Sequence, residues 1–219
     1  MFEEAPLLLY KLKHIDRSRS IVIDASNKCS LQCPKCERAW YLKSKKRVRG
    51  NLLTLDQFKK IVKYYDNYVE FCGQISDVTM NPNLPDFLTH TYDSNILTRV
   101  STAASYRSSD WYVNCFKSNP YAEWIFGIDG LPYQSHIYRK GQDGQKLFDI
   151  MSIGASMGIR VVWQYIVFKY NQDNIESAKQ LAKKHNILFE LNLSSRWDRP
   201  YDPLKPIGNE YVKHITKVS

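Results

Sequence analysis

The sequence predicts an α/β fold in which a mostly parallel sheet is covered by outer helices. Along most of the 219 residues, apolar stretches of strand length alternate with stretches of helical periodicity, which favours repeated β–α units. Right-handed crossovers either curl such units into an open or partial barrel or lay them in a doubly wound sheet. In both arrangements the loops after the strands meet on one face, where binding sites form.

Composition supports one substantial domain or two small ones. Hydrophobic residues make up 43% of the chain and aromatic residues 13%, enough for a sizeable core. No apolar run approaches the length of a transmembrane helix, and Glu3 and Glu4 stand where a secretory signal carries positive charge. We therefore expect a cytoplasmic protein, whose five cysteines are ligands or buried thiols rather than disulfides.

Six strands are predicted from short apolar runs bounded by turn residues. The first run leads directly into a cysteine-rich loop, the second ends at Gly73, and the fourth is closed by Asp129 and Gly130. The strands are expected at residues 21–25, 68–72, 97–102, 123–128, 160–168 and 187–193.

Helices are predicted between these strands from capping residues and apolar periodicity. Thr54 and Gln57 form a capping box, Gly158 ends a helix, and Asp173 with Glu176 is expected to cap the last helix. The helices are expected at residues 6–13, from 54 to about 65, at 84–92, 108–117 and 145–157, and after 173.

The domain organisation follows from where this pattern starts and stops. Residues 1–19 are weakly patterned and predict an N-terminal extension. Residues 20–195 carry the alternating units and form the core domain, and residues 196–219, which contain a proline-rich irregular stretch, form a C-terminal tail.

Three cysteines stand out after the first strand. Cys29, Cys33 and Cys36 have C-x3-C-x2-C spacing, which can hold one face of a metal site and leave a coordination position open. A structural zinc site, with Cys72 or a histidine as fourth ligand, is the alternative. Such sites usually pair their cysteines in two C-x2-C knuckles and this chain has one, so the spacing favours iron–sulfur.

Four segments, in order, resemble the radical S-adenosylmethionine (SAM) enzymes. The cysteine loop resembles that family's C-x3-C-x2-C signature after the first strand. Residues 75–82 lie where the family has Gly-Gly-Glu-Pro, and residues 100–104 where many members have Thr-Asn-Gly. Residues 126–131, with 138–141 nearby, look like the family's Ser-Ile-Asp-Gly-Leu and Tyr-Arg-x-Gly segments.

The resemblance implies a partial (β/α)6 TIM-like barrel and a radical enzyme. Cys29, Cys33 and Cys36 would ligate three irons of a 4Fe–4S cluster, and SAM would chelate the fourth iron. Reductive cleavage of SAM would then give a 5′-deoxyadenosyl radical that abstracts hydrogen from a substrate. Cys72 and Cys115 are isolated and no cysteine follows Cys115, so we expect buried thiols and a minimal member without an auxiliary cluster domain.

The resemblance also implies where SAM would be bound. The backbone and side chain around Ser76 and Asp77 would receive the SAM ammonium group, for which a carboxylate is a good partner. Thr102 would lie near the ribose, and Arg139 could bind the SAM carboxylate. Ser76 and Asp77 replace the usual glycine and glutamate, Gly127 replaces a ribose-contacting serine, and Lys35 replaces an apolar residue before the last cysteine. The expected cofactor-binding residues are Gly73, Ser76, Asp77, Thr102, Asp129 and Arg139.

The net charge and its distribution along the chain indicate the class of substrate. The net charge is +9, and cations gather after the cysteine loop beside Arg38, Trp40 and Tyr41, a pattern that can hold a nucleotide or nucleic acid or form a solvated loop. A peptide or small metabolite is the alternative substrate, and a non-catalytic zinc- or cluster-bearing nucleic-acid-binding protein is the second alternative. An electron donor is the other expected partner. The cations are Lys43, Lys45, Lys46, Arg47 and Arg49.

The fifth strand carries Trp163 and Tyr165 on one face. They could line the barrel interior with Gln164 facing the helices, but packing in the core is the favoured interpretation.

Overall fold

A single sheet of parallel strands organises the chain, with the strands in the order β1-β2-β3-β4-β5-β6. The structure is a computed structural model and describes residues 15–197 and 201–211, so the helix expected at residues 6–13 lies outside the described residues. The strands are β1 (Ser20–Ile23), β2 (Tyr68–Cys72), β3 (Leu97–Thr102), β4 (Glu123–Gly127), β5 (Val161–Ile166) and β6 (Leu188–Asn192).

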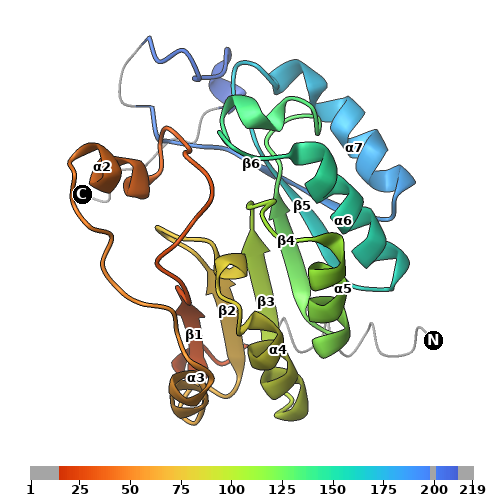
Figure 1. Ribbon diagram of the computed structural model, residues 1–219. Coiled ribbons are helices and arrows are strands. Elements are labelled where there is room, and N and C mark those ends of the chain that lie inside the picture. The colour runs from red at the N-terminus through yellow and green to blue at the C-terminus, as the bar shows by residue number, and fades with distance from the viewer. Residues whose placement is uncertain (1–14, 198–200, 212–219) are drawn as a thin grey trace.

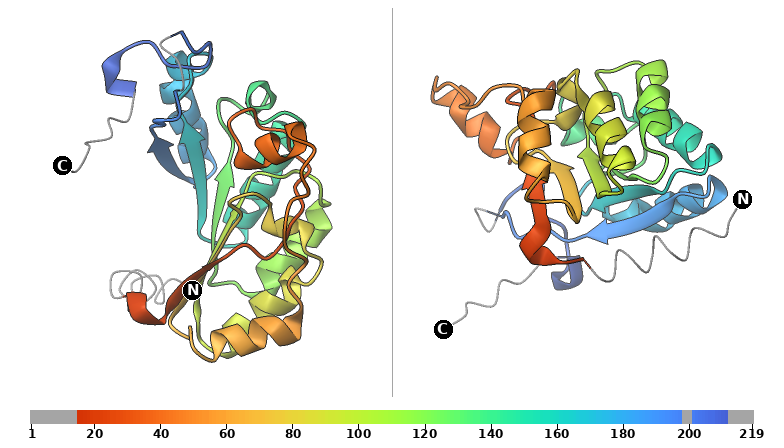
Figure 2. Two further views of the ribbon diagram at one scale, coloured as in Figure 1. Left: turned by 90° about the vertical axis from the view of Figure 1, so that its left-hand side faces the viewer. Right: turned by 90° about the horizontal axis from the view of Figure 1, so that it is seen from below.

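The strand order decides between the two predicted arrangements. Each strand pairs in parallel with the next one along the chain, whereas a doubly wound sheet reverses direction at a switch point. The helices lie on one face of the curved sheet, and β1 and β6 do not meet (Figures 1 and 2). The predicted partial (β/α)6 barrel is therefore confirmed.

Five helices lie where the sequence predicts them, to within a residue or two at most ends. Thr54 caps α3 through the predicted capping box with Gln57, and Ser108 caps α5. The helices are α3 (Leu55–Val62), α4 (Leu84–Asp93), α5 (Ser109–Ser118), α6 (Gly144–Ser156) and α7 (Ile175–Lys184).

Two local predictions are wrong. The sequence predicts no helix after the cysteine loop, but α2 spans Glu37–Lys43. It has no buried residue, so it lacks the apolar face by which a helix is recognised. The N-cap of α7 is Asn174, which makes no side-chain capping bond, so Asp173 and Glu176 do not cap it; a 3-10 turn at Gln172–Asn174 precedes it instead.

The core lies between the sheet and the helices. Phe58, Phe71 and Phe87 join α3, β2 and α4, with the Phe58 and Phe87 ring centroids 4.7 Å apart. On β5, Trp163 packs edge-on against Phe148 of α6 at 5.4 Å, which confirms core packing. Gln164 lines a cavity on the opposite face, so the alternative, in which Trp163 and Tyr165 line the barrel interior and Gln164 faces the helices, is wrong.

The face of the sheet without helices is polar and carries both signs of charge. Glu123 of β4 accepts from Arg99 of β3 at 2.5 Å and from Arg160 at 2.7 Å. On β2, the Tyr68 hydroxyl donates to Glu70. Alternation along the strands thus separates an apolar helix-covered face from one that carries these charges together with some apolar residues, such as Ile125. Within residues 15–197 and 201–211, no helix has the length and apolarity to cross a bilayer.

Phe87→Ala tests the α3–β2–α4 core. Phe87 is fully buried, and emptying such a site costs about 3–5 kcal/mol in transfer and cavity terms. Urea denaturation should show this loss in the free energy of unfolding. Tyr64→Ala, at a residue that is 77% exposed, is the control and should change stability by less than about 0.5 kcal/mol; equal losses would contradict the assigned packing.

Candidate cofactor site

The cysteine loop lies at the carboxyl edge of the sheet, between β1 and α2. Its backbone is held by Gln32, whose N–H donates to the Lys140 carbonyl at 2.9 Å, and by the Lys28 carbonyl, which accepts from the Asp77 N–H at 2.9 Å. Arg38 adds a hydrogen bond to the Asn27 carbonyl at 2.8 Å. Segments that follow three different strands therefore fix the loop.

Cys29, Cys33 and Cys36 line one cavity of about 320 Å³ at this edge. Across the residues that the structure describes, no three His, Cys, Asp or Glu side chains form a group that could hold a metal ion. A 4Fe–4S cluster takes each cysteine at a different iron, so it needs thiols around a shared space, which this cavity provides. The residues present fit such a cluster. Strands β2 to β5 supply the other walls, through Cys72, Ser101, Thr102, Ile125, Gly127, Gln164 and Ile166.

Burial sets the charge state of the thiols. It raises the pKa of Cys29 to about 12, with a contribution from the negative charge of Asp77. It also raises the pKa of Cys33, which the Arg139 guanidinium opposes. Both groups are therefore protonated near neutral pH when no metal is bound, and a metal that binds them must displace the protons.

Asp77 is 5% exposed and its carboxylate is saturated with donors. It accepts from the Thr79 N–H and hydroxyl at 3.0 and 2.6 Å. It also accepts from the Thr102 hydroxyl and from the N–H groups of Ala103 and Ala104, all within 3.0 Å. The structure thus brings Asp77 and Thr102 into direct contact. The carboxylate ties the loop after β2 to the end of β3.

The loop after β2 is pinned from the opposite side by Asp24. Its carboxylate accepts from the Gln74 and Ile75 N–H groups and from the Ser76 hydroxyl. Gly73 is required there, because an added Cβ would lie 2.0 Å from the Ser76 carbonyl oxygen. Asp24 is not among the site residues predicted from the sequence, although its place at the end of the first strand is a usable signal for one. Gly73, Ser76 and Asp77 all line the cavity.

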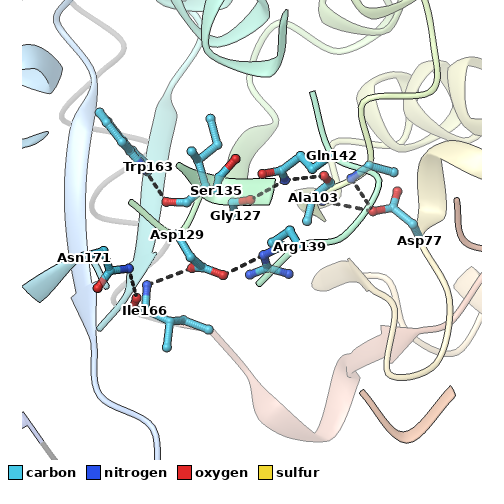
Figure 3. A network of polar contacts seen from close by, with 12 residues as sticks. Asp77, Ala103, Gly127, Asp129, Ser135, Arg139, Gln142, Trp163, Ile166 and Asn171 are labelled. Carbon is cyan, nitrogen blue, oxygen red and sulfur yellow. Dashed lines mark hydrogen bonds and ion pairs between the residues drawn. The ribbon is translucent and has the colours of Figure 1, made fainter. Parts of the chain in front are cut away.

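Asp129 and Arg139 form a buried ion pair on the far side of the cavity (Figure 3). Arg139 Nε donates to Asp129 at 2.7 Å, and the other carboxylate oxygen accepts from the Ile166 N–H at 2.9 Å. Burial raises the pKa of Asp129, which Arg139 opposes, and the negative charge of Asp129 raises the pKa of Arg139 against its own burial. Arg139 stays cationic and lines the cavity.

Gly127 makes room for this guanidinium. A Cβ on Gly127 would lie 2.7 Å from Arg139 Nη2 and 3.1 Å from Cζ. The glycine that replaces a serine in the family pattern therefore has a local cause in this chain. Arg139 occupies the space that a side chain at position 127 would take.

Gln142 is a second residue that the sequence analysis missed. Its Nε2 donates to the carbonyls of Ala103 and Gly127, at 2.6 and 2.9 Å, and so clamps the ends of β3 and β4 together (Figure 3). Its Oε1 is buried and has no partner among the described residues. No periodicity or motif marks it, since its partners are backbone groups on distant strands.

The other two cysteines differ from each other. Cys115 is fully buried in the core, as predicted. Cys72 is only half-buried and lines the cavity beside Ser101, so the expectation of a core thiol is wrong for Cys72. It ends β2 on the face without helices, because β2 alternates and its neighbour Phe71 points to the helices.

Residues after β6 fold back over the cysteine loop. Lys35 forms an ion pair with Asp202, and Arg196 lines the cavity. Trp197 packs edge-on against Phe168 at 5.8 Å and belongs to the apolar cluster that includes the three cysteines. We call residues 194–197 and 201–207 the strap. The family pattern has an apolar residue where this chain has Lys35. The strap supplies apolar cover for the cysteine loop in its place.

Asp129→Asn tests the buried pair. The variant leaves Arg139 charged and unpaired in a buried site, which costs about 3–5 kcal/mol. Guanidinium denaturation should show this loss. Asp129→Asn with Arg139→Met removes both charges and should recover most of it; a single variant as stable as the parent would mean that another group neutralises Arg139.

Comparison with known proteins supports the fold. No protein-family model matches the sequence, and no curated protein matches it. Among solved structures, Streptococcus suis SuiB bound to S-adenosylmethionine has a TM-score of 0.68 at 15% identity, over 93% of this chain and 48% of that one. The structure of anSMEcpe with bound AdoMet and Cp18Cys peptide has a TM-score of 0.62 at 15% identity, over 84% and 54%.

A third structure, methylornithine synthase (PylB), has a TM-score of 0.58 at 13% identity, over 85% of this chain and 57% of that one. The chain thus spans about half the length of these solved structures. All three are radical SAM enzymes. The chain has the partial-barrel fold of radical SAM enzymes.

Proposed function

We propose that the chain is a radical SAM enzyme. The observation that carries the proposal is the convergence of Cys29, Cys33 and Cys36 on one cavity with the cationic Arg139, at the carboxyl edge of a partial barrel. When bound, a 4Fe–4S cluster and SAM supply one-electron chemistry: reductive cleavage of SAM to a 5′-deoxyadenosyl radical, which abstracts hydrogen from the substrate. The five-cysteine composition suits a reducing compartment, so we place its activity in the cytoplasm.

The protein's part is to hold the two cofactors in position. Arg139 donates only its Nε to Asp129, so its terminal nitrogens face the cavity and would bind the SAM carboxylate as a fork. Backbone carbonyls near Gly73 and Ser76 would receive the SAM ammonium group. Asp77 would act through position, because its carboxylate is already saturated. It holds Thr102 at the edge where the ribose would lie.

For the substrate, we propose a peptide or an amino acid. Structures similar to this one are named for a peptide and for methylornithine synthesis. A nucleotide or nucleic acid is the second candidate, and the segment from Lys43 to Arg49 is what favours it.

Cysteine variants test the cluster assignment. After anaerobic reconstitution with iron and sulfide, the parent should gain a broad visible absorbance and release 5′-deoxyadenosine from SAM and dithionite. Ala at position 29, 33 or 36 should abolish both signals, because each thiolate holds a different iron. Cys115→Ala, in the core, should keep both. A colourless parent with one bound zinc ion, or equal loss from Cys115→Ala, would contradict the assignment.

Arg139→Met and Gly127→Ala test the carboxylate contact. The first removes the guanidinium and the second displaces it, so each should weaken SAM binding to the reconstituted protein by about 10- to 100-fold, the value of a hydrogen bond to a charged group. Calorimetry gives the dissociation constants. Lys140→Met changes an exposed neighbouring cation and should leave SAM affinity unchanged; a normal affinity in Arg139→Met would rule out the contact.

A further inference from the structure

The helix after the cysteine loop is attached to the fold at its base and buries none of its own residues. We call α2 and the residues that follow it, 37–49, the basic arm. No residue of α2 is buried, and Trp40 and Leu42 are 54% and 51% exposed. Figure 1 shows α2 standing apart from the helices that cover the sheet. An isolated helix of this length is marginal in water, so a partner that covered the exposed Trp40 ring would stabilise it.

The charge of the basic arm is uncompensated. All five of its cations after Leu42 are exposed, and none forms an ion pair with any residue in the described part of the chain. Lys46 lies over the Trp40 ring at 4.7 Å. An exposed aromatic ring with one cation over it and others nearby in the sequence suits an interface with an acidic protein partner, in which the ring is the anchor and the charges set association rate and specificity.

The basic arm is joined directly to the candidate cluster site. Cys36 is the N-cap of α2, and a helix of seven residues is about 10 Å long, so the exposed end lies close to a cluster ligand. The Arg38 guanidinium donates to the carbonyls of Asn27 and Ile75, which fixes the base of the arm on the loops after β1 and β2. A partner on this surface would therefore sit beside the cluster.

We propose that the basic arm is the docking surface for an acidic one-electron carrier protein. The inference rests on the proposed function, because reductive cleavage of SAM consumes an electron that must come from outside the chain. A reduced flavin or iron–sulfur carrier would lose one electron, a flavin hydroquinone becoming the semiquinone, and the cluster would gain it. The position of the arm beside Cys36 favours an electron carrier over nucleic acid, because a carrier must approach the cluster, whereas a nucleic acid held by cations and a stacking ring need not.

The test compares two electron sources on the reconstituted full chain. Stopped flow follows bleaching of the cluster by flavodoxin hydroquinone, an acidic FMN protein, and separately by dithionite. Reversal of four arm charges (K43E, K45E, K46E and R47E) should lower the flavodoxin second-order rate constant at low salt by about tenfold or more. The dithionite rate and SAM affinity should not change. A matched reversal of four exposed lysines elsewhere (K59E, K60E, K183E and K184E) should leave the flavodoxin rate near that of the parent.

The outcomes separate the two claims. Trp40→Ser keeps every charge. It should slow reduction of the cluster by flavodoxin and leave the rate with dithionite unchanged, and this result would support docking. Equal slowing by both charge reversals would reflect net charge and overturn docking. A flavodoxin rate unaffected by the arm reversal, combined with loss of salt-dependent tRNA binding, would also overturn it in favour of a nucleic-acid surface. A cluster that dithionite cannot reduce would instead remove the proposed function, and docking with it.

Discussion

The Asp77 carboxylate is the group on which the geometry of the site depends. A buried carboxylate is costly unless donors surround it, and this one collects N–H and hydroxyl groups from Thr79, Thr102, Ala103 and Ala104. Those donors come from the loop after β2 and the end of β3, so neither segment can move without stranding the charge. The Asp77 N–H bonds the Lys28 carbonyl, which extends the constraint to the cysteine loop.

On the opposite wall of the cavity a second buried carboxylate, that of Asp129, is also stabilised by donors, and here one of them is a cation. Asp129 holds Arg139 and the Ile166 N–H, and Gln142 bridges the carbonyls of Ala103 and Gly127. The cavity is therefore framed by polar groups whose hydrogen bonds, Gln142 Oε1 excepted, fix its shape before any cofactor enters. Such preorganisation is what a site needs to hold a reactive species in one position.

The sequence predicts the fold well because its signals are local. Strand length, capping boxes and apolar spacing place the strands and α3 to α7, and the cysteine spacing places the thiols on the active edge. Features that depend on contacts between distant segments, or that leave no pattern in the sequence, could not be predicted. The helix α2 buries nothing, a period of two cannot say which face of β5 meets the helices, and single polar residues carry no motif. The single residues whose position or role the sequence did not reveal are Asp24, Cys72, Gln142 and Gln164.

The positions of the cysteine loop and the strap in the sequence imply an order in which the site is completed during synthesis. The cysteine loop lies near the start of the sequence and its cover lies near position 200, where Trp197 joins the apolar cluster that includes the cysteines and Asp202 pairs with Lys35. During synthesis the loop emerges well before the residues that close it. Until the strap has been made, the cysteine loop therefore lacks its contacts with Trp197 and Asp202, and its thiols are more open to iron and sulfide than they are in the folded chain.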